Sequence, residues 1–408
     1  MDRCLCIFLF LLAPVFVGAQ GKTAPISVGA LSIVQQQGYT DTIFHDHIDR
    51  TADDFVIVSL LISEPSKGLF SCMGHTAFRM QCPSFGLDYV FHYVTVDMDE
   101  TLNETETYLL GRFVVQMVAD SFDTYVANGK NIRRGVTEYP LYLPAVDKQF
   151  LWKLLDKEMM KGGYMKYDFF REGCAIKMAQ LLTRAVAPKS IDYSLCDTRL
   201  RRPKFETLYR ALADYPWCRF GMMTALYGHN PQEKYDDFLF LPSDLAKAWQ
   251  SATIDGENIA GCGQAITRHW YYEDNVWLTP MRVALLLLLL GIINLFVKRP
   301  YINWLLLATQ VFMSIIIFCI TILKLSDISW NWLFVPFNIL PVLFWHWRHY
   351  WALPYAIVLA IWVLAMLFVP SCLVDSTHVV LTIAFILVLC NNRGNTYQNV
   401  LSKVLLKK

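Results

Sequence analysis

The sequence predicts an α+β exported domain followed by a helical membrane region. Three features of the 408 residues support this: strand-like runs between residues 55 and 143, helical apolar spacing after them, and long apolar stretches beyond residue 277. The chain is 55% hydrophobic and only 17% charged, which excludes a disordered protein. Its 36 Lys and Arg nearly balance 35 Asp and Glu, so the composition does not favour a nucleic-acid partner.

The first 19 residues have the form of a secretory signal peptide. A short basic start precedes an apolar core from Cys4 to Val17, and Val17-Gly18-Ala19 provides the small residues of a cleavage site. An uncleaved anchor helix is the alternative. In either case, the sequence predicts that residues 20–277 are exported.

Five apolar stretches follow Trp277, at about 279–297, 302–323, 329–346, 351–370 and 377–390. Each approaches the ~20 residues that cross a bilayer. Positive residues favour the segments that would be cytoplasmic: Lys298, Arg299, Arg348, Arg393, Lys403, Lys407 and Lys408, against Lys324 in an outer loop. We therefore expect about five spans over residues 278–392, a basic cytoplasmic tail over 393–408, and an exported domain outside a bacterial cytoplasmic (inner) membrane.

Within the exported part, strands precede helices. Residues 55–62 form a buried-strand run, 74–81 alternate in part, 88–97 are rich in β-branched and aromatic residues, and 137–143 form a further strand that Pro140 limits to an edge. Residues 145–161 and 174–187 show helical apolar spacing. This order predicts helices packed on an antiparallel sheet.

Six cysteines are exported: Cys72, Cys82, Cys174, Cys196, Cys218 and Cys262. Exported cysteines usually pair, so three disulfides are expected. Cys72–Cys82 and Cys196–Cys218 are plausible pairs, although spacing does not fix the connectivity. The spacing of Cys and His does not suit zinc, and no metal site is predicted.

Cys174 has a setting unlike the others. It follows a polar Glu172-Gly173 break and begins a predicted helix, whose dipole would lower the pKa of the thiol. A nucleophilic cysteine needs a base. His75 at a strand start and His92 in the next strand could both reach one helix end. On spacing alone, a disulfide-bonded or buried Cys174 with a surface His75 is the alternative.

Several motifs resemble, in the same order, the Lnb-type lipoprotein N-acyltransferases over roughly residues 50–250. Gly74-His75-Thr-Ala-Phe-Arg79 is similar to the family's Gly-His-(Ser/Thr)-Ala-(Leu/Phe)-Arg, and residues 91–97 are similar to its aromatic-Asn-Tyr-Gly-Thr-Phe-Asp strand. Later similarities fall at residues 108–113, 138–143, 167–174 and 240–245. The resemblance implies a permuted papain-like domain with Cys174 as nucleophile and His75 as its base.

The chain departs from the family pattern at Met73 (usually Trp), Gly173 (Asn), His92 (often Asn) and Val94 (Gly). Gly173 bears on helix entry and on a donor to the oxyanion. His92 fits a third catalytic residue that orients the base, because lecithin–retinol acyltransferases are similar in carrying a His on the following strand. A half-buried strand histidine is the alternative. Weaker candidates are Asp97, Tyr164 and Tyr167.

The resemblance implies a membrane lipoprotein N-acyltransferase. An acyl chain, expected to come from the sn-2 position of the diacylglyceryl group, would pass through a Cys174 thioester to the N-terminal cysteine amine and give a lyso-form lipoprotein. The implied partners are a diacylated lipoprotein and the phospholipid bilayer, without a cofactor and with the oligomeric state open. Two other classes remain: a membrane-tethered cysteine peptidase or amidase acting on cell-wall peptides, and a non-catalytic scaffold with all six cysteines paired.

Overall fold

A computed structural model of the chain describes residues 49–66, 71–96, 114–131, 133–162, 165–167, 172–197, 204–226, 241–268, 277–323, 332–369 and 374–405. The chain divides into two compact units. Unit 1 comprises residues 1–202 and 234–272, and unit 2 comprises residues 203–233 and 273–408. The predicted signal peptide, residues 1–19, lies outside the described residues.

Unit 1 is built on a seven-stranded sheet with the order β6-β4-β3-β2-β1-β5-β9, in which every neighbouring pair is antiparallel. The strands are β1 (Ile57–Ser63), β2 (His75–Cys82), β3 (Leu87–Thr95), β4 (Val114–Ser121), β5 (Val136–Pro140), β6 (Met165–Lys166) and β9 (Gln264–Ala265). A separate hairpin joins β7 (Thr253–Ile254) to β8 (Glu257–Asn258). The four predicted strands correspond to β1, β2, β3 and β5, whereas β4 has no counterpart in the prediction. The expectation that Pro140 limits its strand to an edge is wrong, because β5 pairs with β1 on one side and with the short β9 on the other.

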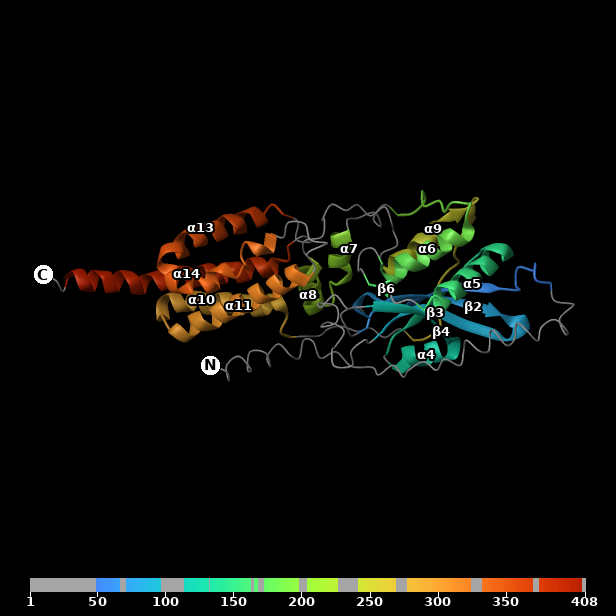
Figure 1. The fold of residues 1–408 in the computed structure, drawn as a ribbon, viewed down its shortest axis with the longest axis horizontal. Helices are drawn as coiled ribbons and strands as arrows, with labels where there is room; N and C mark the ends of the chain where they lie inside the picture. The colour runs from blue at the N-terminus through green and yellow to red at the C-terminus, as the bar shows by residue number, and fades with distance from the viewer. Residues whose placement is uncertain are drawn as a thin grey trace. The chain divides into compact units, whose positions relative to one another are not determined.

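Helices cover both faces of the sheet (Figure 1). One face carries α5 (Ala145–Met160), α6 (Cys174–Val186) and α9 (Pro242–Ser251), and the other carries α4 (Phe122–Asn131). Leu60 and Phe78 share the larger core with Met178 of α6, whereas Leu61 and Tyr125 belong to a smaller core under α4. Successive side chains of a strand point to opposite faces, so one sheet supports two cores.

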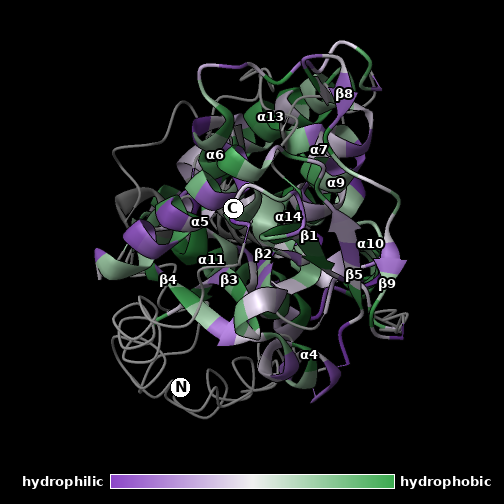
Figure 2. Ribbon diagram, turned by 90° about the vertical axis from the view of Figure 1, so that its right-hand side faces the viewer, coloured by the Kyte–Doolittle hydropathy of each residue, from purple (hydrophilic) through white to green (hydrophobic). Residues whose placement is uncertain are grey.

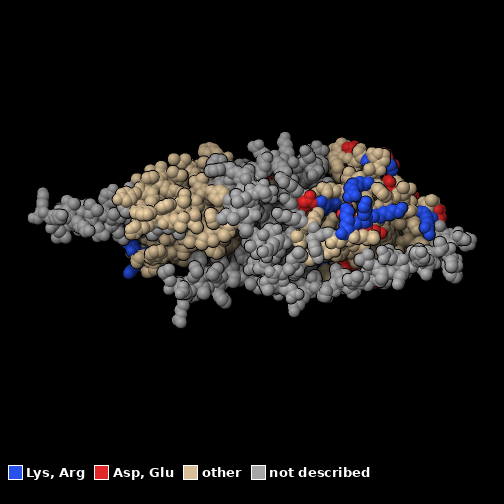
Figure 3. Space-filling model, viewed as in Figure 1, with Lys and Arg blue, Asp and Glu red and all other residues tan. Residues whose placement is uncertain are grey.

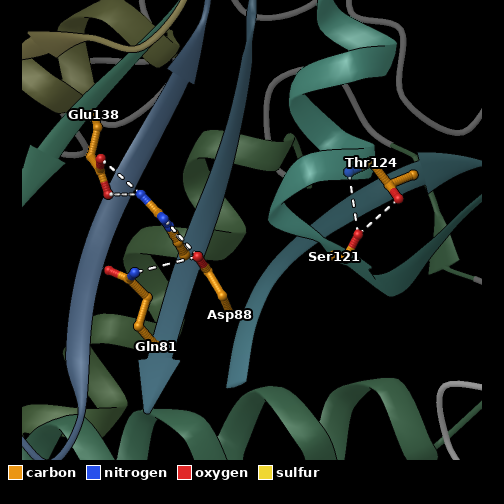
Figure 4. A network of polar contacts seen from close by, with 6 residues as sticks. Gln81, Asp88, Ser121, Thr124 and Glu138 are labelled. Atoms are coloured by element: carbon orange, nitrogen blue, oxygen red, sulfur yellow. Dashed lines mark hydrogen bonds and ion pairs between the residues drawn. The ribbon is translucent and has the colours of Figure 1, made fainter. Parts of the chain in front are cut away.

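The chain turns from β4 directly into α4, a helix that the sequence analysis did not predict. The backbone N–H of Thr124 donates to Ser121 Oγ over 3.2 Å, which satisfies one of the free amides at the helix start (Figure 4). The two helices that were predicted, over 145–161 and 174–187, agree with α5 and α6.

Unit 2 consists of helices: α7 (Lys204–Ala211), α8 (Pro216–Leu226), α10 (Pro280–Val297), α11 (Pro300–Leu323), α12 (Leu340–Leu343), α13 (Arg348–Met366) and α14 (Ser376–Leu405). Two of the described helices, α10 and the Pro300–Cys319 part of α11, are long and apolar enough to cross a membrane. Shorter apolar helices are Tyr350–Met366 and Ser376–Cys390. α10 and α11 are green in Figure 2, and α10 leaves leucines such as Leu286 more than half exposed, which suits a lipid environment.

The predicted span over 329–346 is not one helix in the part that the structure describes. Residues 332–347 form a 3-10 turn at Trp332–Phe334, the four-residue α12, and a second turn at Trp345–Trp347. Proline lacks an N–H, so Pro336 interrupts a helix and Pro341 fits only the first turn of α12. Between them, Asn338 Oδ1 accepts the Leu340 N–H and closes a local turn. The two prolines therefore explain why an apolar stretch of spanning length is broken here.

Candidate active site

The two predicted histidines lie side by side on the α4 face of the sheet. His92 of β3 pairs with Ala77 of β2, and His75 is two residues before Ala77, on the same face. The ring centroids of His75 and His92 are 5.5 Å apart, with the ring planes at 79°. His75 and His92 are seventeen positions apart in the sequence, and the strand register brings their imidazoles together.

The glycine before His75 fixes where β2 begins. Gly74 has a φ of +82°, and a Cβ at this position would lie only 2.6 Å from the Ser63 carbonyl oxygen. A larger residue would be strained and would clash with the end of β1. Because Ser63 pairs with His75 in the sheet, this close approach also sets the position of the imidazole.

A carboxylate that the sequence analysis missed holds His92. His92 Nε2 lies 3.1 Å from Asp120 Oδ2, and the two side chains are only 11% and 10% exposed. A carboxylate accepts hydrogen bonds, so the Nε2–H of His92 is the donor. Asp120 is on β4, the strand without a predicted counterpart, which explains why no sequence signal pointed to it.

Tyr125 of α4 completes the polar cluster on this face. Its ring centroid is 5.1 Å from that of His92, and its hydroxyl lies 2.8 Å from Ser63 Oγ at the end of β1. Burial raises the pKa of the Tyr125 phenol, and the neighbouring Cys174 and Asp120 act in the same direction. The phenol therefore stays protonated at neutral pH, and Cys174 lies within electrostatic reach of it.

Cys174 is the first residue of α6, as predicted. Gly173 precedes it with extended backbone (φ −73°, ψ 160°) and, having no side chain, leaves the first amides of the helix without a side-chain cap. The Cys174 thiol is free and partly exposed, whereas the next two residues are buried. The thiol therefore stands at the helix start, beside backbone amides that no side chain caps.

Comparison with protein families gives one match. Residues 45–214 match the Lnb N-terminal periplasmic domain. This part of the chain is similar to that domain. The matched range contains His75, His92, Asp120, Tyr125 and Cys174, and runs from before β1 to just beyond α7. No curated protein and no solved structure matches the chain. The matched domain and the apolar helices together indicate an inner-membrane protein with a periplasmic domain and a part in lipoprotein modification.

Within the Lnb domain, His75 has an unusual electrostatic setting. Burial lowers the pKa of His75 well below its ordinary value, and the neighbouring His92 and Arg134 lower it further. Arg134 lies just before β5, where its Nη2 donates to Ser66 Oγ over 2.9 Å. His75 is therefore neutral at pH 7, and an imidazole in this state can accept a proton.

The remaining sequence predictions have mixed outcomes. Cys174 and Cys262 are both free thiols, so three disulfides among the six exported cysteines do not form. Tyr167 is partly buried, while Asp97 and Tyr164 lie outside the described residues. Among the residues that the structure describes, no group of three or more His, Cys, Asp or Glu side chains has the geometry of a metal site.

Proposed function

We propose that this protein, in which residues 45–214 match the Lnb N-terminal periplasmic domain, is a lipoprotein N-acyltransferase that uses Cys174 as nucleophile and His75 as general base. The observation that carries the proposal is the free thiol of Cys174 at a helix start, electrostatically linked to the cluster of Tyr125 and His92 beside a neutral, partly buried His75. The order of the elements, with His-bearing strands before the Cys-bearing helix, agrees with the permuted papain-like domain that the resemblance implies.

The first half of the reaction forms a thioester. His75 takes the proton of the Cys174 thiol, and the thiolate attacks the carbonyl carbon of the sn-2 ester in the diacylglyceryl group. The oxyanion of the tetrahedral intermediate accepts hydrogen bonds from free backbone amides at the start of α6, among them that of Cys174. The bond between the carbonyl carbon and the glyceryl oxygen then breaks, and that oxygen receives the proton from His75.

The second half transfers the acyl chain to nitrogen. The α-amino group of the lipoprotein's N-terminal cysteine attacks the thioester carbonyl, and His75 accepts a proton from the attacking amine. The carbon–sulfur bond breaks, and the Cys174 thiolate leaves and is reprotonated from His75. The products are an N-acylated lyso-form lipoprotein and the unchanged enzyme.

His92 and Asp120 have a positioning role in this scheme. The Asp120 carboxylate fixes His92 through the Nε2–H, and the fixed His92 ring packs edge-on against His75. A rigid neighbour limits the orientations that the His75 imidazole can adopt. His92 is thus the third member of the catalytic group, through its contact with the base.

The test is mass spectrometry of an N-terminal lipopeptide from cells that express the wild type, Cys174→Ser or Cys262→Ser. Cys262 is the matched control, because it is also a free thiol but is exposed. We expect the N-acylated lyso-form with the wild type and Cys262→Ser, and the unmodified diacylglyceryl form with Cys174→Ser. If the acylation state of the N-terminus is the same in all three strains, the proposal is wrong, and a cysteine peptidase or amidase acting on cell-wall peptides is favoured.

A further inference from the structure

One face of α5 combines exposed apolar and basic residues at helical spacing. Val146, Phe150 and Met160 are 75%, 43% and 61% exposed, although side chains of this size are usually buried. Lys153, Lys157 and Lys161 are exposed between and beside them. These six residues are named the α5 stripe. From Val146 to Lys157 they are three or four positions apart, and Met160 and the C-cap residue Lys161 lie three and four positions after Lys157, so all six follow one side of the helix.

The opposite side of α5 explains why the stripe faces outward. Leu151, Leu154 and Leu155 are buried in the main core of unit 1, which fixes the rotation of the helix on the sheet. Because these leucines already face the core, the side chains of the stripe cannot be buried by rotation of the helix. In Figure 3, Lys and Arg side chains gather on the surface of unit 1 over α5 and α6.

The carboxylates of α5 lie to the sides of the stripe. Glu158 accepts from Lys161 over 2.7 Å and lies 3.4 Å from Arg184 of α6, and Asp147 lies 3.3 Å from Lys189. Asp156 and Glu158 are partly buried, whereas Lys153 and Lys157 are exposed. The outermost charges of this face are thus positive, and they alternate with apolar side chains.

We propose that the α5 stripe rests on the anionic phospholipid headgroups of the bilayer that the apolar helices enter. Basic residues interleaved with a Phe and other apolar side chains are the composition of helices that lie in a membrane interface. The lysines meet lipid phosphates, and Val146, Phe150 and Met160 insert between the headgroups. Unit 1 ends at residue 272 and the apolar helix α10 begins at residue 280, so the chain tethers unit 1 to a bilayer through a short linker. This tether does not depend on the proposed acyl transfer.

The test uses the full-length protein in nanodiscs and short-pulse amine acylation of its lysines, read by mass spectrometry. One preparation contains phosphatidylcholine alone, and the other contains a third phosphatidylglycerol. We expect acylation of Lys153 and Lys157 to slow by about fivefold in the anionic nanodiscs, the factor for one Lys contact with an anionic surface. Raising the salt to about 0.5 M should remove the effect, because exposed charges are then screened.

Lys130, exposed on α4 at the other face of the sheet, is the internal control and should react equally in both lipids. The Phe150→Ser variant keeps every charge of the stripe but should reduce the protection of Lys153 and Lys157. Equal acylation of these lysines in both lipids overturns the proposal. Protection that appears without anionic lipid when an acidic protein is added also overturns it and identifies a protein-binding surface. Neither outcome involves Cys174, so the acyl-transfer proposal stands or fails separately.

Discussion

On the α4 face of the sheet, β2 and β3 carry one polar cluster around Arg79 and another around His75 and His92. The Arg79 guanidinium donates to Asp88 over 2.9 and 2.6 Å and to Glu138 over 3.1 Å (Figure 4). It also lies 3.3 Å from the centroid of the Phe122 ring. Every charge in this cluster has an opposite charge as its partner, so the cluster has little capacity to react.

The histidine cluster, on the same two strands, is arranged in the opposite way. His75 and His92 are like groups placed together, and the neighbouring Arg134 makes protonation of His75 still less favourable. A buried group whose charged form is disfavoured is a typical catalytic candidate, whereas a fully paired ion cluster is typically structural. In the proposed scheme, the motif Gly74-His75-Thr-Ala-Phe-Arg79 thus contains two parts, a histidine for the chemistry and an arginine for the fold.

The substitution His75→Gln should have the largest effect, and it should lower activity without lowering stability. We expect the rate of lipoprotein N-acylation to fall by about a thousandfold, as for loss of a general base, while the melting temperature changes little. The measurement is the rate of lipopeptide conversion beside thermal unfolding of the same preparation. His346→Gln, an exposed histidine of unit 2, is the control and should leave both unchanged. Near-wild-type conversion by His75→Gln would rule out His75 as the base.

Arg79→Met should have the reverse effect. Removal of the guanidinium leaves Glu138, which is 13% exposed, without its countercharge, so we expect the free energy of unfolding to fall by about 2 kcal/mol. The rate per folded molecule should stay near that of the wild type. Denaturant unfolding measures the first quantity and active-thiol titration normalises the second. Arg184→Met, which removes a guanidinium from an exposed position, should cost much less. An Arg79→Met protein that is stable but inactive would contradict the division of the motif.

Asp120→Asn tests whether the carboxylate acts through His92. The amide keeps the size of the side chain but loses the charge that holds the Nε2–H, so we expect the rate to fall about tenfold to a hundredfold, as for loss of other groups that orient a histidine. The effect should be non-additive with His92→Gln, because both changes disrupt one contact. Fully additive losses in the double variant would show that Asp120 acts independently of His92.

The sequence pointed to Cys174 and His75 of the proposed site, but not to Asp120 and Tyr125. Cys174 and His75 could be proposed from the sequence because each has a local signal, a cysteine at a helix start and a Gly-His pair at a strand start. Asp120 and Tyr125 were missed because they reach the site through the pairing of β3 with β4 and the packing of α4, which are non-local. Apolar composition likewise predicted a span over 329–346, but the backbone chemistry of Pro336 and Pro341 breaks that stretch into short pieces.

The smallest expected effect concerns pH and the charge of Arg134. The pKa of His75 is lowered in the folded protein, so between that value and about 6.5 the unfolded chain binds more protons. The contribution of His75 to stability is therefore complete above pH 6.5 and is lost as the pH falls below it. In catalysis, the base must be neutral, so the rate declines only when the pH falls to the lowered pKa of His75.

Arg134→Gln removes the positive charge of the guanidinium that helps to lower the pKa of His75. The acid limb of the pH–rate profile should therefore move to higher pH, by less than about one unit because burial and His92 remain. The loss of stability below pH 6.5 should become shallower for the same reason. Arg134→Lys keeps the charge and should restore both profiles, while Lys130→Gln removes an exposed charge of α4 and should move neither. An acid limb that stays in place in Arg134→Gln would mean that the base responsible for it is not the histidine beside Arg134, and it would separate the charge cluster from the chemistry.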